Sequence, residues 1–334
     1  MIHLSDIGEF GLIKRFSQQF LQDIPGKYTG IGDDCAVILL NEKEVLLVTT
    51  DMLIEDSHFI KNKISAFELG QKSLMVNLSD IAAMGGTPGS AYLSIGLTSG
   101  TDIEWIDEFF KGIKKACREY DIFLLGGDTT KSPDRLVINF VVLGTGIPKE
   151  IKRRSTAVPG DVICINDCVG DSGGGLQILL NGLPEDKDSK YLIRRHNCPR
   201  ANVREGKWLS GWKEIHAMID VSDGIESDIH RIMESSNVGA EIDLDKVPLS
   251  EELRRTAEKY KWNAHEIGVS GGEDYCLMCT VSEKNLDKIM SEYEKEFKKP
   301  IYNIGRITDT KEDLTFMYAG KVTGLVKHGW DHFK

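Results

Sequence analysis

The 334-residue sequence has fewer basic than acidic residues and no long apolar run. The first shortage argues against a nucleic-acid-binding protein, and the second against a membrane-spanning one. It contains 41 lysines and arginines against 52 aspartates and glutamates, which leaves a formal charge of −11. Because nucleic-acid-binding proteins normally carry a basic face, we expect no nucleic-acid partner. The longest apolar run, residues 137–147, is shorter than the roughly 18 residues that a membrane-spanning helix needs. Residues 1–10 lack the basic and apolar segments of a secretory signal, so we expect a cytoplasmic protein.

Cysteine is also scarce: the chain has seven, an odd number, scattered over its length. Such a set does not form the disulfide framework of a small secreted protein. Cys276 and Cys279 have the spacing of a metal or redox motif, but they fall in a run, residues 275–281, that is typical of a strand. Side chains alternate along a strand, so the two thiols would point to opposite faces. We therefore interpret them, together with Cys164 and Cys168, as buried core residues.

The common phosphate-binding loops are missing. Residues 126–132 end like a Walker A loop but lack its second glycine. Gly30-Ile-Gly32 and Gly144-Thr-Gly146 do not extend to the GxGxxG pattern of a Rossmann dinucleotide site. Residues 170–175 could offer backbone amides to an anion or form a tight strand-to-helix turn. A nucleotide site in this chain would therefore be of another type.

Apolar β-rich runs alternate with amphipathic stretches along the chain. The expected strands are residues 44–50, 90–97, 122–125, 136–144 and 162–166, and the expected helices are residues 67–84, 102–120, 174–180 and 224–234. This alternation predicts a two-domain protein of the α/β (α+β) class. The polar stretch that follows Gly146 indicates a domain boundary, which divides the chain into residues 1–147 and 148–334.

Aspartates recur directly after apolar strand-like runs, and their placement is the most informative feature of the sequence. Asp51, Asp128, Asp220 and Asp223 follow such runs, and Asp34 opens another. In open α/β sheets, ligands bind beyond the carboxyl ends of the strands. We therefore expect these carboxylates to converge on one crevice.

Helix geometry adds Asp80 to this set. In the helix expected from residue 67, Ser73, Asn77 and Asp80 recur at i, i+4 and i+7 and so lie on one face. Apolar and small residues surround Asn77 and Asp80 in the sequence. We therefore expect this polar face to line a site.

Carboxylates that converge need counter-charge, because like charges raise one another's pKa. Magnesium ions meet this need, since they bind carboxylate oxygens and complete their coordination with substrate phosphates. Each acid also has a structural interpretation: Asp223 could cap the following helix together with Glu226, and Asp128 and Asp34 could form turns. Taken together, the acids predict phosphate chemistry on bound magnesium.

Seven short motifs follow one another over nearly the whole chain: residues 30–36 (GIGDDCA), 49–51 (TTD) with 58–59 (HF), 77–85 (NLSDIAAMG), 125–130 (LGGDTT), 220–224 (DVSDG), 270–275 (SGGEDY) and 330–333 (WDHF). Together and in this order they resemble the motifs of the thiamine monophosphate kinase family. The resemblance implies ATP-dependent phosphorylation of thiamine monophosphate to thiamine diphosphate, the last step of thiamine diphosphate biosynthesis. It also implies the two-domain fold of the aminoimidazole ribonucleotide synthetase superfamily. In that fold the N-terminal sheet pairs across a homodimer, and the C-terminal α/β domain closes the ATP cleft.

The same resemblance implies roles for single residues. The ligands of several Mg²⁺ ions would be Asp34, Thr49, Thr50, Asp51, Asp80, Asp128, Asp220 and Asp223. The contacts to ATP would include Gly127, Asp128, Arg154 and Ser222, and thiamine monophosphate would meet His58, Glu273 and Trp330. Phe110 stands where many relatives have tyrosine, so it is left out of the site.

No catalytic base is expected for this reaction. The attacking group is a phosphate oxygen, and a second pKa of about 6 leaves it mostly ionised at neutral pH. Direct in-line transfer then depends on positive charge, from magnesium and Arg154, that brings two anions together. Glu273 could accept from the aminopyrimidine, and the Trp330 indole could attract the thiazolium cation or only anchor the tail.

Two alternatives stay open at this point. One is another enzyme of the same superfamily, such as aminoimidazole ribonucleotide synthetase or selenophosphate synthetase. The other is a protein that binds magnesium and nucleotide without turnover.

Overall fold

The first half of the chain forms a six-stranded mixed sheet in the computed structural model, which describes residues 3–22 and 24–324. The strand order is β1-β2-β3-β6-β4-β5, and only β4 and β5 pair in parallel. The strands are β1 (Tyr28–Thr29), β2 (Ala36–Asn41), β3 (Glu44–Ile54), β4 (Thr87–Leu97), β5 (Phe123–Lys131) and β6 (Val137–Gly146). Three helices accompany this sheet: α1 (Leu4–Leu21), α2 (Ala66–Ala83) and α3 (Ile103–Glu119).

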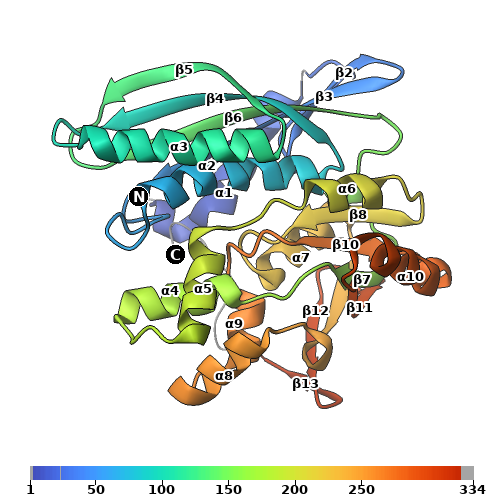
Figure 1. Ribbon diagram of the computed structural model, residues 1–334. Helices are drawn as coiled ribbons and strands as arrows, with labels where there is room; N and C mark the ends of the chain where they lie inside the picture. Colours follow the sequence, from blue (N-terminus) through green and yellow to red (C-terminus); the bar gives the residue numbers. More distant parts are fainter. Residues whose placement is uncertain (1–2, 23, 325–334) are drawn as a thin grey trace.

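Helices α2 and α3 lie along one face of this sheet (Figure 1). The Ser65 hydroxyl and the Glu68 carboxylate cap the start of α2 reciprocally, each accepting the other's backbone N–H. The two helices approach closely at Gly70 and Gly112. A Cβ at Gly70 would lie 2.1 Å from the Phe109 carbonyl oxygen, so only glycine allows this approach.

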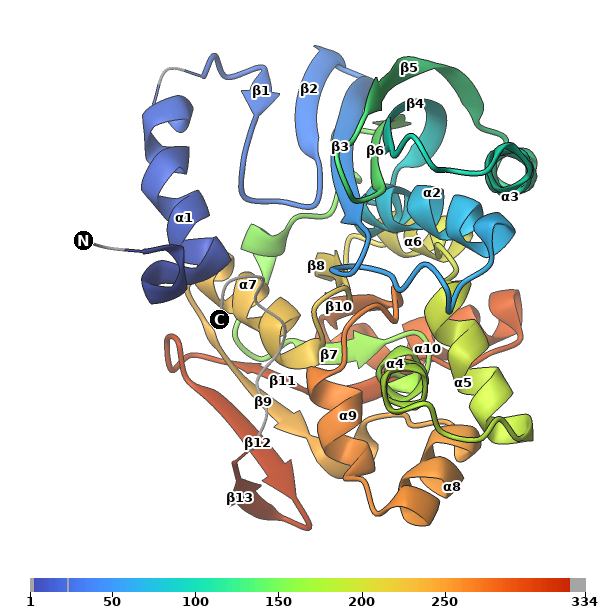
Figure 2. The same ribbon diagram turned by 90° about the vertical axis from the view of Figure 1, so that its left-hand side faces the viewer.

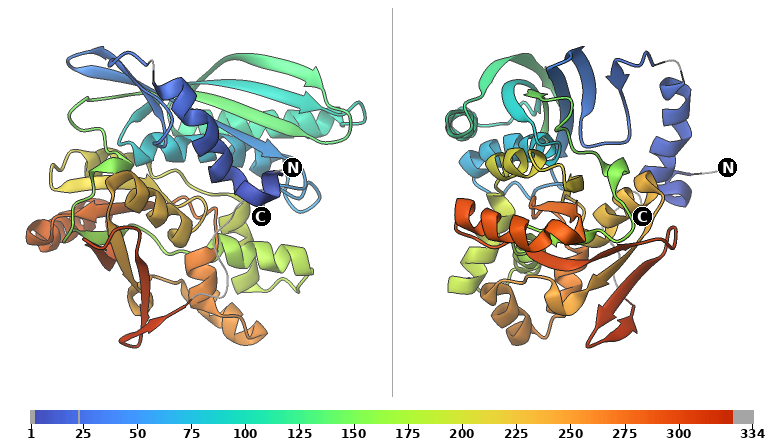
Figure 3. Two further views of the ribbon diagram at one scale, coloured as in Figure 1. Left: turned by 180° about the vertical axis from the view of Figure 1, so that it is seen from behind. Right: turned by 90° about the vertical axis from the view of Figure 1, so that its right-hand side faces the viewer.

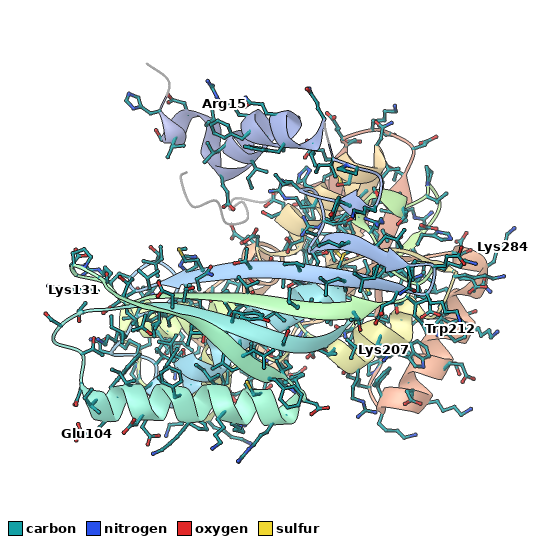
Figure 4. The ribbon with its side chains drawn as sticks, turned by 90° about the horizontal axis from the view of Figure 1, so that it is seen from above. Arg15, Glu104, Lys131, Lys207, Trp212 and Lys284 are labelled. Atoms are coloured by element: carbon teal, nitrogen blue, oxygen red, sulfur yellow. The ribbon has the colours of Figure 1, made fainter. Side chains whose placement is uncertain are left out.

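The opposite face of the first sheet is not covered by a described helix (Figure 4). Alternation along β3 sends Leu47 and Leu53 into the core, whereas Met52 points the other way and is 49% exposed. At the edge of the sheet, all nine residues of β5 are exposed, including Phe123 and Leu125 at 63% each. The first sheet thus ends in an uncovered, partly apolar strand.

The second half forms a seven-stranded sheet with the order β13-β12-β9-β11-β7-β10-β8. Its strands are β7 (Val162–Ile165), β8 (Ile215–Asp220), β9 (Gly239–Asp243), β10 (Leu277–Val281), β11 (Tyr302–Thr308), β12 (Leu314–Tyr318) and β13 (Lys321–Thr323). Its helices are α4 (Asp171–Asn181), α5 (Lys187–Asn197), α6 (Val203–Ser210), α7 (Ile225–Ser236), α8 (Glu251–Tyr260), α9 (Ala264–Ser270) and α10 (Leu286–Phe297). Three single 3₁₀ turns complete the described elements: η1 (Arg154–Thr156), η2 (Leu244–Lys246) and η3 (Glu283–Asn285).

Helix α2 joins the two halves. Its last residues, Ala82 and Ala83, are fully buried in a cluster with Leu209 of α6 and Met218 of β8. Helix α2 therefore packs on its own sheet with one side and on the second half with its C-terminal end.

The connection between the halves runs over residues 147–161, between the end of β6 and the start of β7. The predicted boundary between residues 147 and 148 falls at its start and stays a prediction. Helix α1 stands beside β1 and β2 and reaches α7, where Lys14 and Glu234 form an ion pair at 3.2 Å (Figures 2 and 3).

The predicted two-domain α/β (α+β) architecture is confirmed. The expected helix over residues 67–84 is α2, shifted by one residue, and the expected strand over residues 90–97 extends to Thr87 in β4. No described helix has the length and apolarity required to cross a bilayer. The cytoplasmic location stays a prediction.

Three of the four cysteines interpreted as buried core residues are buried, and the interpretation is wrong for the fourth, Cys168. Cys276 and Cys279 are both fully buried, and they lie in different hydrophobic clusters, on opposite faces of the second sheet. Cys164 is also buried, whereas Cys168 is partly exposed. The seven cysteines are free thiols, all within the described residues.

Candidate active site between the two halves

Three carboxylates from distant parts of the sequence meet where the two halves face each other. Asp34 precedes β2, Asp80 lies on α2, and Asp220 ends β8. One oxygen of each lies within 4.8 Å of the others. These three residues are called the acid cluster below. Asp51 of β3 is an electrostatic neighbour of the acid cluster.

Neighbouring polar side chains orient these acids. The Ser79 hydroxyl donates to Asp220 Oδ2 at 2.6 Å, and the Thr49 hydroxyl donates to the Asp80 carboxylate. The amide oxygen of Asn77 accepts the backbone N–H of Asp51 at 3.0 Å. Of the polar face predicted for α2, Asn77 and Asp80 therefore line this site, whereas the Ser73 hydroxyl donates to the Gly70 carbonyl oxygen at 3.2 Å.

The acid cluster carries more negative charge than its surroundings neutralise. Burial, together with the charge of Asp34, raises the pKa of Asp220 to about 8, although Ser79 and Arg154 oppose the shift. Burial and the charge of Asp223 raise the pKa of Asp51 to about 6. Burial and the other acids likewise raise the pKa of Asp80 well above its usual range. Such a set is short of positive charge.

Arg154 is the cation that pairs with the acid cluster. It lies on η1, in the connection between the halves, and its Nη2 donates to Asp34 Oδ1 at 2.5 Å. The Asp33 carboxylate accepts the Arg154 backbone N–H at 2.8 Å and so holds this turn in place. Burial disfavours the Arg154 cation, but Asp34 outweighs this and raises its pKa above the usual range.

The donor atoms of the acid cluster fit a hard divalent cation. Asp34 Oδ2 is buried and, among the described residues, accepts no hydrogen bond. Buried polar atoms are normally paired, so this oxygen calls for a partner. Three carboxylates without nitrogen or sulfur ligands match the preference of Mg²⁺.

The loop after β8 brings Ser222 and Asp223 beside the acid cluster. The backbone N–H groups of both residues donate to Asp228 Oδ2, at 3.1 and 3.2 Å. The alternative in which Asp223 caps the next helix is wrong, because the residue before α7 is Gly224, at a φ of 99°. Asp228, a buried residue that the sequence reasoning missed, shapes the loop instead.

The loop of residues 271–275 lies on the other side of Ser222. The Glu273 backbone N–H donates to the Ser222 carbonyl oxygen at 2.7 Å, and Glu273 itself has a positive φ of 65°. The Glu273 Oε2 atom lies 3.1 Å from Lys72 Nζ and 3.2 Å from His196 Nδ1. We call Glu273, Lys72 and His196 the Glu273 cluster.

The charges of the Glu273 cluster are balanced. Burial alone would raise the pKa of Glu273, but the Lys72 ammonium and His196 outweigh it, and the pKa lies below its usual range. Burial and Lys72 lower the pKa of His196 to about 4, so its ring is neutral at pH 7. His58 also acts on Glu273, and its Nδ1 accepts the Ile54 backbone N–H at 3.0 Å.

Two residues of the predicted site stand apart from the acid cluster within one chain. Asp128 and its neighbour Gly127 lie on the exposed edge strand β5, which β4 and β6 separate from β3. The prediction that Asp128 converges with the other acids is therefore wrong for a single chain. It relied on the ends of strands, and these converge only where the strands lie close together in the sheet.

Gly127 and Thr50 make contacts within the first sheet. A Cβ at Gly127 would lie 1.7 Å from the Leu93 carbonyl oxygen, so the sheet itself requires glycine here. Thr50 points away from Thr49 and donates to Asn139 Oδ1 at 3.2 Å, on the uncovered face. Trp330 lies outside the described residues.

The residues 170–175 form the tight turn that was one of their two interpretations. Gly170, at a φ of 81°, precedes α4. The backbone N–H groups of Gly170 and Ser172 donate to the Asp274 carboxylate at 2.6 and 3.1 Å. The anion at this helix start is therefore a side chain of the protein.

Comparison with known proteins identifies relatives of the whole chain. Residues 32–146 match the family model "AIR synthase related protein, N-terminal domain", and residues 158–316 match "AIR synthase related protein, C-terminal domain". The chain is 38% identical over 335 residues to the thiamine-monophosphate kinase of Escherichia coli K12, covering 98% of both chains. It is 32% identical to the thiamine-monophosphate kinase of Aquifex aeolicus, covering 99% of this chain and 100% of the other.

A solved structure is similar over the same length. AaThiL complexed with AMPPCP and TMP has a TM-score of 0.86 and 32% sequence identity, covering 99% of each chain. Structures of the hydrogenase maturation protein HypE are 18–20% identical and show the fold alone.

Proposed function

Because the chain belongs to the thiamine-monophosphate kinase family of AIR synthase related proteins, we propose that it phosphorylates thiamine monophosphate to thiamine diphosphate with ATP. The acid cluster is the observation that carries this proposal. It gathers carboxylates from both halves of the chain so closely that their mutual repulsion favours the binding of cations. A relative with a matching fold binds AMPPCP, an ATP analogue, and TMP. The thiamine-monophosphate kinases match over nearly the full chain at 32–38% identity, which favours this activity over the other synthetases of the superfamily.

Asp34, Asp51, Asp80, Asp220 and Asp223 would hold magnesium, with Thr49 beside them. Bound Mg²⁺ would neutralise phosphate oxygens and position them for in-line transfer. Thr49 and Ser79 orient the carboxylates for this task through their hydroxyl groups. The resemblance implies that these acids hold several ions.

Arg154 and Ser222 would bind the nucleotide. A planar guanidinium suits phosphate oxygens, and the pairing with Asp34 already directs Arg154 toward the acid cluster. Asp228 fixes the backbone of Ser222 and Asp223 and so presets the loop for its ligand. The same loop bonds to Glu273, which connects the nucleotide side with the substrate side.

Transfer would be direct, without a catalytic base and without a phosphoenzyme. The attacking phosphate oxygen is already ionised, so the protein has to position two anions rather than remove a proton. His58 and Glu273 would contact thiamine monophosphate, and Trp330 would add an aromatic face. Incubation with labelled ATP alone tests the first point, because a stable labelled protein would contradict direct transfer.

We also propose a homodimer in which the first sheets of two copies pair. The edge strand β5 is exposed along its length and carries Phe123 and Leu125, which a monomer would leave in water. Met52 on β3 extends this apolar surface over the uncovered face. In such a dimer, Asp128 and Gly127 would complete the site of the partner subunit.

The experiment that tests the activity is a turnover assay. The protein is incubated with ATP, Mg²⁺ and thiamine monophosphate, and ADP and thiamine diphosphate are measured. We expect equal amounts of both products, and no ADP release when thiamine monophosphate is omitted. Nucleotide binding without turnover would instead support a binding protein, and turnover only with another acceptor would support another enzyme of the superfamily.

A further inference from the structure

Lys72 is a fully buried lysine for which the mechanism above has no use. It lies in the middle of α2, and its side chain has an exposed fraction of 0%. Its Nζ donates to Glu273 Oε2 at 3.1 Å and to the backbone carbonyl oxygen of His196 at 3.1 Å. Burial of an ammonium group is costly unless it is paired, so these contacts determine where Lys72 lies.

The contacts of Lys72 join three separate parts of the fold. Lys72 belongs to the first half, whereas His196 near the end of α5 and Glu273 in the 271–275 loop belong to the second. The ion pair therefore ties the loop that carries Glu273 to the helix that carries Asp80.

Glu273 is held from two sides, at its backbone and at its carboxylate. Its N–H donates to Ser222, and its positive φ of 65° is unusual for a residue with a side chain. Lys72 and His196 both contact Oε2, while the side chain keeps 24% of its surface exposed. A ligand can therefore still contact the Glu273 side chain.

Direct contact between Lys72 and a substrate phosphate does not fit this geometry. The Lys72 side chain has no exposed surface, whereas the Glu273 side chain that it contacts is 24% exposed. A lysine that binds phosphate needs its Nζ to be accessible. Lys72 therefore acts through Glu273.

We propose that Lys72 is a positioning residue for the acceptor substrate: it holds the Glu273 carboxylate, and with it the 271–275 loop, in the orientation that binds the ring end of thiamine monophosphate. This inference rests on the proposed function. The inference goes beyond the proposed function because it assigns Lys72 an effect on the binding of thiamine monophosphate and not on the binding of ATP.

The first test is the variant Lys72→Met, which keeps the length of the side chain and removes its charge. We expect the KM for thiamine monophosphate to rise about tenfold or more, as for the loss of a charged hydrogen bond, while the KM for ATP changes less than about twofold. Without the ammonium, burial raises the pKa of Glu273. The ratio of the KM for thiamine monophosphate in the variant to that in the wild type should then increase as the pH falls, since protonation of the substrate phosphate is common to both proteins.

Lys152→Met is the matched control. Lys152 is also buried, at 6% exposed, but its Nζ donates to the carbonyl oxygens of Trp212 and Ile215 and, among the described residues, to no carboxylate. If Lys72 only stabilised the fold, both variants would lower the melting temperature and neither would separate the two KM values. Equal rises of both KM values in Lys72→Met, or no change, would overturn the inference.

The double variant Lys72→Met/Glu273→Gln tests whether Lys72 acts through Glu273. We expect its KM for thiamine monophosphate to equal that of Glu273→Gln alone, because the second change has nothing left to remove. Effects that multiply would overturn the inference. The double variant also covers the case in which Lys72→Met fails to fold, because it leaves no unpaired charge in the core.

Wild-type turnover is measured first, so that the two proposals fail in different ways. If the wild type does not phosphorylate thiamine monophosphate, the proposed function is wrong, and so is the assignment of thiamine monophosphate as the ligand of Glu273. If the wild type turns over and Lys72→Met keeps its KM, only the role of Lys72 is wrong.

Discussion

The two ionic clusters at the junction of the halves are opposites in charge balance. The acid cluster gathers carboxylates around Arg154, and the pKa values of Asp80 and Asp220 lie above their usual range. The Glu273 cluster supplies its own cation, and the pKa of Glu273 lies below its usual range. Both clusters share α2, which contributes Asp80 to one and Lys72 to the other.

This difference indicates what each cluster can bind. A group of carboxylates that stay partly protonated without a partner gains stability when cations arrive. A carboxylate that is already paired gains little from a cation, and it offers a fixed hydrogen-bond acceptor instead. The acid cluster is therefore suited to metal and phosphate, and the Glu273 cluster to an organic group with N–H donors.

The strongest test of this contrast is Asp220→Asn. We expect turnover to fall by about a thousandfold or more, because the variant removes charge from the metal site without removing core volume. Without magnesium, the variant should be more stable than the wild type at pH 8, since a repelled carboxylate is gone. Asp309→Asn, at an exposed position, is the control, and wild-type turnover in Asp220→Asn would exclude Asp220 from the mechanism.

Asp128→Asn shows which chain completes the acid cluster. We expect it to abolish turnover with little loss of fold, because Asp128 is exposed on β5 and contributes nothing to the core. When Asp128→Asn and Asp220→Asn subunits are mixed, activity should return to about a quarter of the wild-type value, because half of the dimers contain one intact site. The sedimentation of the mixture confirms the dimers, and a mixture without activity would mean that Asp128 serves its own chain.

Glu273→Gln is expected to act on substrate affinity more than on rate. The KM for thiamine monophosphate should rise about tenfold, while kcat and the dependence on magnesium change little, because Glu273 lies outside the proposed magnesium ligands. Steady-state kinetics at varied magnesium measure all three quantities. A large loss of kcat or a changed magnesium requirement would show that the two clusters are one functional unit.

The smallest effect concerns pH and stability. Asp51 and Asp220 have raised pKa values, of about 6 and 8, so their protonated forms are favoured in the folded protein. Their contribution to the free energy of unfolding is therefore present at pH 4 and is lost as the pH rises toward 8. Magnesium should therefore raise the melting temperature more at pH 8 than at pH 5.5, by a few degrees. Thermal unfolding at both pH values measures this difference, and an equal gain at both would contradict the charge deficit of the acid cluster.

The sequence predicts much of the fold and one side of the site. Helix α2 could be predicted because Ser73, Asn77 and Asp80 recur with its period, and the acids near strand ends predicted the acid cluster. Alternation along β3 separates Thr50 from Thr49 and Asp51, a distinction that the resemblance alone does not make.

The remaining parts depend on contacts that no local pattern encodes. Lys72 lies 201 positions from Glu273 in the chain, and only the packing of the two halves brings them together. Its signal in the sequence is a lone lysine within a helix of apolar and small residues. Asp128 was misplaced because the order of strands in a sheet does not follow from the strands themselves.

Helix α2 also sets a distance. Asp80 lies eight positions after Lys72, which corresponds to about 12 Å along the helix axis. The helix therefore fixes the distance between Lys72, which positions the proposed contact to the substrate ring, and Asp80, which would hold magnesium for the phosphates. An insertion or deletion between these residues would change both the spacing and the direction of the side chains. Relatives that phosphorylate a longer or shorter substrate would therefore have to change the loops around α2 and keep the length of the helix.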